Sequence, residues 1–245
     1  MLDLHCHLLP DVDDGARSLS EAVAMARALH SVGFVAAAPS PHYGEGPGGD
    51  VAIALAHERR AALAEALVHA GVELELLANA EHHVSPELFA RAAGSRVVPI
   101  GGRGRWLLVE LPWGGIANPD NVLFRLQSKG YKLLLAHPER HRFLDDALIE
   151  GFVARGICLQ IELGSFVAMY GDAAQERALR WSRAGWTHVV ASDLHRPEQA
   201  VAWMSMALAE LTRVLGEAAR PRALVDNPRL IVDDASVEAL LPMGG

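Results

Sequence analysis

Leu2-Asp3-Leu4-His5-Cys6-His7 is the stretch from which the fold of this chain is deduced, because it joins a short apolar strand to a pair of candidate metal ligands. In an extended strand alternate side chains share a face, so His5 and His7 point one way and Cys6 points the other. Burying two imidazoles is costly unless their lone pairs are used, and a divalent cation uses them. A His-x-His pattern alone is a weak indication of a metal site, so the rest of the chain has to support it.

Strand-like and helix-like segments alternate along the chain after this first strand. Apolar runs predict further strands at residues 34–38, 72–80, 106–111, 132–136, 157–163 and 188–192, with a small strand at 97–100. Amphipathic patterns and capping residues predict helices at residues 18–32, 51–70, 86–93, 118–129, 145–155, 173–184 and 197–215, with a short final helix near residues 226–229. Residues 43–50 contain four glycines and one proline, a composition typical of a mobile loop.

Strands that are mostly followed by a helix predict an α/β fold with a parallel barrel of the TIM type. An open, doubly wound sheet is the alternative, but no Gly-x-Gly-x-x-Gly fingerprint follows the first strand. No internal repeat, linker or change in composition divides the 245 residues. We therefore expect a single domain that spans residues 1–245.

Composition excludes several functional classes. A net charge of −8 argues against a nucleic-acid partner, which needs clustered basic side chains. No apolar run has membrane-spanning length and no signal-peptide pattern opens the chain, so we expect a cytoplasmic protein without membrane insertion. Cys6 and Cys158 lie far apart within apolar runs, and we expect both to be buried free thiols of a reducing compartment.

Side chains able to bind metal recur just past the carboxyl ends of the predicted strands, and in a barrel these ends meet at one rim. The set combines imidazoles with carboxylates: His5, His7, Asp14, His42, Glu81, Glu110, His137, Asp193 and His195. Nine ligands exceed the roughly four to six coordination positions of one ion and suit two or three ions with shared ligands. Nitrogen and carboxylate ligands favour manganese, iron or zinc over calcium or magnesium.

The remaining polar residues receive simpler interpretations. The other histidines are not assigned to the site: His30, His57, His69, His82, His83, His141 and His188. The chain has no Cys-x5-Arg phosphatase loop and no Gly-x-Ser-x-Gly elbow, and Cys6 has no activating partner. Metal-bound hydroxide is therefore the predicted nucleophile.

Seven segments, spread over nearly the whole chain, resemble those of a known superfamily. They are Leu4-His5-Cys6-His7, Asp11-Val12-Asp13-Asp14-Gly15, Ala80-Glu81, Leu107-Leu108-Val109-Glu110, Ala136-His137-Pro138-Glu139-Arg140, Ala191-Ser192-Asp193-Leu194-His195 and Asp226-Asn227-Pro228-Arg229. Their order and spacing resemble the polymerase and histidinol phosphatase (PHP) superfamily, and more closely its capsule-type, manganese-dependent protein-tyrosine phosphatases of bacteria. The combination of Asp-Asp-Gly, His-Pro-Glu-Arg and Ser-Asp-x-His is specific to this branch.

The resemblance implies a distorted (β/α)7 TIM-like barrel, the PHP fold, with a centre of two or three divalent ions, manganese first. It makes Asp14 rather than Asp13 a ligand, and it makes Arg140 a phosphoryl-binding residue. Arg196 corresponds to an arginine that lies several residues later in relatives, so the shorter loop here changes its reach. We expect the loops around Tyr43 and Trp113 to wall an open substrate site.

The reaction that the resemblance implies is hydrolysis of phosphotyrosine in the tyrosine-rich tail of a bacterial tyrosine kinase that controls capsule or exopolysaccharide synthesis. His141, where relatives often have tyrosine, and the glycine-rich stretch after Tyr43 depart from the family pattern.

Three alternatives stay open at the level of the sequence. A PHP phosphatase acting on a small phosphomonoester, such as histidinol phosphate, usually has a longer chain and a lidded pocket. A metal-dependent amidohydrolase also begins with His-x-His, but it often uses a carboxylated lysine after a middle strand, and neither Lys129 nor Lys132 ends one. A non-catalytic module would keep the barrel and its metals for stability alone.

Overall fold

The computed structural model describes residues 1–43 and 53–240. All strand pairs within these residues are parallel, in one sheet of order β1-β2-β4 and another of order β3-β5-β6-β7-β8-β9. The strands are β1 (Leu2–Cys6), β2 (Ala36–Pro39), β3 (His42–Tyr43), β4 (Glu75–Leu76), β5 (Glu81–His83), β6 (Trp106–Glu110), β7 (Lys132–Ala136), β8 (Cys158–Glu162) and β9 (Thr187–Ala191).

Hydrogen bonds join the two sheets along both of their borders. On one side, β2 and β3 are parts of a single stretch that two prolines interrupt, since proline offers no N–H to a neighbouring strand. The stretch that contains β4 and β5 runs beside it, where the Glu81 amide donates to the Pro41 carbonyl at 3.1 Å. On the other side, the Asp193 amide donates to the His5 carbonyl at 2.8 Å. These parallel stretches close into a distorted (β/α)7 barrel, which confirms the predicted fold.

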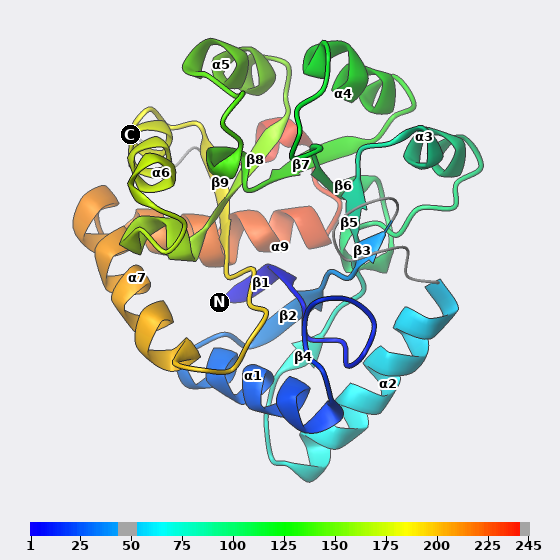
Figure 1. Ribbon diagram of the computed structural model, residues 1–245, viewed down its shortest axis with the longest axis vertical. Helices are drawn as coiled ribbons and strands as arrows, with labels where there is room; N and C mark the ends of the chain where they lie inside the picture. Colours follow the sequence, from blue (N-terminus) through cyan, green and yellow to red (C-terminus); the bar gives the residue numbers. More distant parts are fainter. Residues whose placement is uncertain (44–52, 241–245) are drawn as a thin grey trace.

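Helices surround the strands in the order of the sequence (Figure 1). They are α1 (Leu19–Ser31), α2 (Ile53–His69), α3 (Pro86–Ala93), α4 (Pro119–Gln127), α5 (Asp146–Ala154), α6 (Asp172–Arg183) and α7 (Ala200–Leu215). Local chemistry sets several starts, because the side chains of Ser18, Ser85 and Asp145 each accept a hydrogen bond from a backbone amide in the first turn.

The last helical stretch crosses the middle of the molecule in Figure 1 and comprises α8 (Ala219–Pro221), η4 (Arg222–Asp226) and α9 (Asn227–Val232). Residues that follow it hold the strand beginnings: the Trp106 indole donates to the Ala235 carbonyl at 2.9 Å, and Lys132 Nζ lies 2.6 Å from Asp234 Oδ1. Ile231 packs in the same cluster as Trp106. The amino-terminal end of the barrel is thereby closed, which leaves the opposite end for a site.

Alternation along β8 shows how the barrel interior is built. Leu159 and Ile161 pack in the large cluster between strands and helices, whereas Cys158 packs in the smaller cluster around Trp106. Residues two apart share a face, so Gln160 and Glu162 lie on the side of Cys158. A polar layer thus occupies the carboxyl end of the barrel above an apolar one.

Several element predictions need correction. The strand predicted at residues 97–100 is wrong, because Ile100 opens a short 3-10 turn, η1 (Ile100–Gly102), whose Gly101 and Gly102 have φ of 79° and 75°. Residues 72–80 form only the short β4. The helix predicted from residue 197 begins at Ala200, after Gln199 at a φ of 55°. The glycine-rich loop predicted at 43–50 lies, beyond Tyr43, outside the described residues.

Two further predictions concern the thiols and the membrane. Cys6 and Cys158 are both buried and free, as predicted. None of the helices in the described ranges combines the length and the apolar character that crossing a membrane requires.

Candidate metal centre

The nine predicted ligands converge at the carboxyl end of the barrel. They form four overlapping groups, and the potential ligand atoms of each group lie within 4.8 Å of one another. The groups are His7, Asp14, His42 and His195; His5, His137 and Asp193; His5, His7 and Glu81; and His42, Glu81 and Glu110. A cavity of about 170 Å³ lies against seven of the nine, and its wall also contains Trp113 and Arg140.

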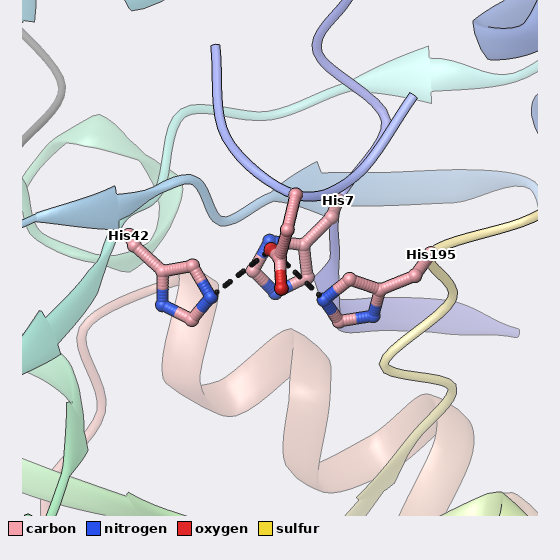
Figure 2. Close-up of side chains that lie close together, drawn as sticks. His7, His42 and His195 are labelled. Atoms are coloured by element: carbon pink, nitrogen blue, oxygen red, sulfur yellow. Dashed lines mark ion pairs between the residues drawn. The ribbon is translucent and has the colours of Figure 1, made fainter. Parts of the chain in front are cut away.

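Asp14 lies between two imidazoles that come from opposite borders of the sheets. Its Oδ1 is 3.3 Å from His42 Nε2 and 3.4 Å from His195 Nε2. Figure 2 shows the rings of His7, His42 and His195 gathered around this point. The ring of His7 stacks on that of His195 with centroids 4.0 Å apart.

Gly15, the last residue of the Asp-Asp-Gly motif, explains the shape of the loop that carries Asp13 and Asp14. A Cβ on Gly15 would overlap the His7 carbonyl oxygen and side chain, so only glycine allows the loop to fold back over the end of β1. This close approach places Asp14 at the cavity and directs the Asp13 carboxylate to the His7 ring.

His5 and His7 face each other through nitrogen atoms that carry lone pairs when the rings are neutral. His5 Nδ1 lies 2.9 Å from Gln160 Oε1, and His7 Nδ1 lies 2.8 Å from Asp13 Oδ2. Because these oxygens only accept, each Nδ1 carries the proton. The two Nε2 atoms are 3.3 Å apart, and Asp193 Oδ1 is 3.2 Å from each. Such a convergence of electron pairs needs a positive charge at its centre.

Several buried side-chain atoms that could coordinate a metal ion have no hydrogen-bond partner here. They include Glu81 Oε2, Asp193 Oδ1 and His42 Nδ1. The last lies 2.9 Å from Glu81 Oε2, yet the geometry forms no hydrogen bond. Unsatisfied buried atoms of this kind are rare in proteins, and imidazole with carboxylate is a ligand set of first-row transition metals. The residues therefore fit divalent metal ions.

The electrostatics of the cluster favour positive charge. Burial disfavours the charged form of His137, but its hydrogen bond to Glu81 and the charge of that carboxylate raise the pKa to about 10. Burial likewise opposes protonation of His42, yet Asp14 and Glu81 raise its pKa to about 10. Against the effect of burial, the imidazoles hold the pKa of Glu81 well below its usual range. A proton or a metal ion can supply the charge that these carboxylates attract.

Two of the candidate ligands have a backbone that is uncommon for residues other than glycine. His137 follows β7 directly with a φ of 34°, and Asp193 follows β9 with a φ of 48°. Left-handed conformations of this kind cost about 1–3 kcal/mol each and cluster at functional sites. Here they direct both side chains into the cavity as the strands end.

Arg140 is held by carboxylates and by aromatic rings. Its Nη1 donates to Glu162 Oε1 at 2.7 Å and to Asp193 Oδ2 at 3.3 Å. The guanidinium lies over the rings of Trp113 and Tyr170, with 4.7 and 4.2 Å to their centroids. Trp113 in turn stacks on His141 at 4.6 Å. The predicted phosphoryl-binding residue thus has a fixed position at the cavity wall.

The structure does not bring the other two predicted substrate residues to this cavity. Arg196 Nη1 donates to the backbone carbonyls of Gly15 and His195, and its side chain lines a neighbouring groove. The Tyr43 ring packs edge-on against His82, with the Arg91 guanidinium 4.2 Å above its centroid.

A layer of residues that orient the candidate ligands was not predicted from the sequence. Asp13 accepts a hydrogen bond from His7 Nδ1 and Gln160 accepts one from His5 Nδ1, and His83 Nδ1 lies 3.2 Å from Glu110 Oε2. Glu162 is fully buried beside Arg140. A signal for two of them was present, since Gln160 and Glu162 alternate with apolar residues in a strand that is otherwise buried and apolar.

Comparisons with known proteins agree with this geometry. The chain matches the family model described as capsular polysaccharide synthesis, CpsB/CapC, over residues 1–233. The tyrosine-protein phosphatase YwqE of Bacillus subtilis is 28% identical over 240 residues, which are 97% of this chain and 93% of that protein. CapC of Staphylococcus aureus is 27% identical over 210 residues, or 80% of this chain and 77% of CapC.

Solved structures give the same result. One from a study of YwqE of Bacillus subtilis and CpsB of Streptococcus pneumoniae, described as metal-dependent tyrosine phosphatases, has a TM-score of 0.87 at 28% identity and covers 96% of both chains. The phosphotriesterase homology protein of Escherichia coli, solved with phosphate in its active site, has a TM-score of 0.61 at 13% identity over 94% of this chain and 98% of that one. The second likeness concerns the fold alone.

The match to the family model includes every candidate ligand and all the strands of the barrel. The chain belongs to the CpsB/CapC family of capsular polysaccharide synthesis.

Proposed function

We propose that this protein is a metal-dependent protein-tyrosine phosphatase that acts on the tyrosine-rich tail of a bacterial tyrosine kinase controlling capsule or exopolysaccharide synthesis. The observation that carries the proposal is the convergence of five imidazoles and four carboxylates beside Arg140. Support comes from the family match and from the similarity to YwqE, a tyrosine-protein phosphatase, over 97% of this chain.

The nine predicted ligands would hold two or three divalent ions. Their mixture of nitrogen and carboxylate donors suits manganese, iron or zinc, and we infer manganese from the resemblance to manganese-dependent phosphatases. When bound, such ions supply Lewis acidity toward phosphoryl oxygens and lower the pKa of a water nucleophile. The buried donor atoms that lack hydrogen-bond partners support this assignment.

Arg140 supplies the fixed positive charge that a phosphoryl group needs at the wall of the cavity. Glu162 and the rings of Trp113 and Tyr170 restrain its guanidinium before substrate arrives, so little side-chain entropy is lost on binding. Asp13 and Gln160 keep protons on the Nδ1 atoms of His7 and His5, which leaves each Nε2 free to bind metal. We further propose a cytoplasmic location, in keeping with two buried free thiols.

A substrate comparison tests the proposal. With manganese, purified protein is expected to hydrolyse a phosphotyrosyl peptide with a kcat/KM well above that for histidinol phosphate, and to leave amide substrates intact. The His137→Ala variant is expected to lose activity and part of the bound metal, because it lacks the imidazole that would coordinate metal next to Glu81. A clear preference for histidinol phosphate, or amide hydrolysis without phosphatase activity, would contradict the proposal.

A further inference from the structure

The cavity at the candidate metal centre is too small for a protein substrate. Its volume of about 170 Å³ is below the roughly 300–1,000 Å³ that is typical of clefts holding a whole small ligand. A phosphoryl group fits such a space, but the tyrosyl ring together with its flanking polypeptide does not. The remainder of a phosphotyrosyl substrate must therefore occupy another surface.

A groove of about 550 Å³ continues from this cavity and shares with it Arg140, Asp193 and His195. One bank is the turn at Met169 and Tyr170, which follows η3 (Leu163–Val167). The volume lies in the range of roughly 300–1,000 Å³ that is typical of ligand-binding clefts. A chain whose phosphoryl group lay among the candidate ligands could pass over Arg140 directly into this groove.

The other bank is formed by Gln199 and Trp203 at the start of α7. Met169 is 45% exposed, a large fraction for an apolar side chain, and Trp203 is half-buried. Methionine and tryptophan adapt to varied apolar partners, so together they form a surface that accepts different side chains.

The charged and uncharged side chains of the groove are distributed unevenly along it. The inner end of the groove, beside Arg140, carries the cation that suits a phosphate, whereas Met169, Gln199 and Trp203 are uncharged. Two further charged residues line the groove: Arg196, whose Nη1 donates to two backbone carbonyls, and Glu198, whose side chain is 65% exposed. On the far side of Arg140, Trp113 is stacked on His137 and His141, with centroids 5.5 and 4.6 Å away. The groove thus suits a segment that is anionic at one end and apolar beyond it.

We propose that the groove between Met169 and Trp203 binds the polypeptide on one side of the phosphotyrosine, with an apolar side chain seated against these two residues. The proposal rests on the proposed phosphatase function and adds to it a substrate class: a phosphotyrosine flanked by an apolar residue. Contacts in the groove raise affinity for the peptide without contributing to the chemical step.

Kinetics with two kinds of substrate test the groove. p-Nitrophenyl phosphate ends at its ring and carries no flanking residue, whereas phosphotyrosyl peptides with leucine on either side of the phosphotyrosine do. Peptides with alanine at those positions serve as references. For Met169→Ala and Trp203→Ala we expect KM for the leucine peptides to rise roughly tenfold, the scale of lost apolar contacts in a pocket. Turnover of p-nitrophenyl phosphate is expected to stay unchanged.

Met206→Ala provides the matched control, because Met206 is a 63% exposed methionine of α7 that does not line the groove. If Trp203→Ala unfolds, Met169→Glu tests the same bank at an exposed position. The test compares the kcat/KM for the leucine peptides with the kcat/KM for p-nitrophenyl phosphate. If the ratio of these two values is the same in the wild type and in the groove variants, the proposed peptide groove is refuted, while the phosphatase function stands. A wild type that hydrolyses neither substrate would overturn both.

Discussion

Two of the candidate ligands, His5 and His7, depend on a neighbour that fixes their protonation and orientation. The Asp13 carboxylate accepts from His7 Nδ1 and from the Gly15 amide, at 2.8 and 2.9 Å, so one side chain sets both the tautomer and the loop. Gln160 has the same function for His5. Partners of this kind hold a ligand in the form that metal binding needs.

The Asp13→Asn variant tests this dependence. The amide keeps an acceptor oxygen but loses the charge that favours a proton on His7 Nδ1. Manganese affinity, measured by calorimetry on metal-free protein, is expected to fall about 10–100-fold. Asp11→Asn in the same loop is the control, since Asp11 is exposed and outside the cluster, and its affinity should match that of wild type. Equal affinities for all three proteins would refute a positioning function for Asp13.

Arg140 allows a test that separates substrate binding from metal binding. Arg140→Ala removes the cation from the cavity wall, so we expect KM for a phosphotyrosyl peptide to rise at least tenfold, with a smaller change in kcat. Bound manganese, measured by elemental analysis, should stay at the wild-type level. Unchanged kinetics would remove Arg140 from the site.

At the scale of elements, two turns and one strand end hold each other in register. The Glu139 carboxylate, in η2 (Pro138–Arg140), accepts from the Glu162 amide at 2.9 Å and from the Ser165 hydroxyl at 2.7 Å. The Glu162 carboxylate in turn accepts from Arg140. Glu139 and Arg140, which are consecutive in the His-Pro-Glu-Arg motif, are therefore both bound to the end of β8. Glu139 binds it through its carboxylate and Arg140 through its guanidinium.

Glu162→Gln is expected to loosen Arg140 while it preserves the shape of the β8 end. Loss of the ionic hydrogen bond should raise KM for phosphopeptide, and the inhibition constant of inorganic phosphate, by roughly tenfold. Glu176→Gln on α6, whose side chain is 77% exposed, is the matched control. A variant with wild-type phosphate affinity would show that Glu162 has no part in positioning Arg140.

The order of elements could be predicted from the sequence because strand runs and helix caps are local signals, as at Ser18 and Ser85. The strand predicted at residues 97–100 was wrong because an apolar run before two glycines does not distinguish a strand from a turn that packs Ile100 into the core. Most candidate ligands could be proposed from the sequence because they lie at or just past the ends of predicted strands, whereas the choice of Asp14 over Asp13 rested on the family resemblance. Gln160 could not be paired with His5, since that contact spans 155 positions and depends on barrel closure.

At the scale of the whole molecule, the barrel joins an apolar lower layer to a charged upper one. The cluster around Trp106 and Ile231 fills the closed end, and the candidate ligands occupy the other end. Burying so many carboxylates and imidazoles together is costly without cations. The stability of the molecule should therefore depend on what occupies the upper layer.

Metal-free protein is expected to lose stability as pH rises. In the folded state the pKa values of His42 and His137 are raised to about 10, whereas an unfolded histidine titrates near 6.5. Their contribution is complete below pH 6.5 and declines as pH rises toward 10, because the folded state then binds more protons than the unfolded one. The Tm of chelator-treated protein should fall between pH 7 and pH 9, and manganese should reduce this fall. A Tm that stays constant or rises without metal would contradict this explanation.

The most direct test of a metal-dependent tyrosine phosphatase is to titrate metal-free protein with manganese while following bound metal and hydrolysis of a phosphotyrosyl peptide together. We predict that activity is absent at the start, appears as manganese binds, and reaches a plateau at two or three equivalents, in accord with the four overlapping ligand groups. Full activity in the metal-free protein, or a plateau of binding without phosphotyrosine hydrolysis, would show that the protein is not a metal-dependent tyrosine phosphatase.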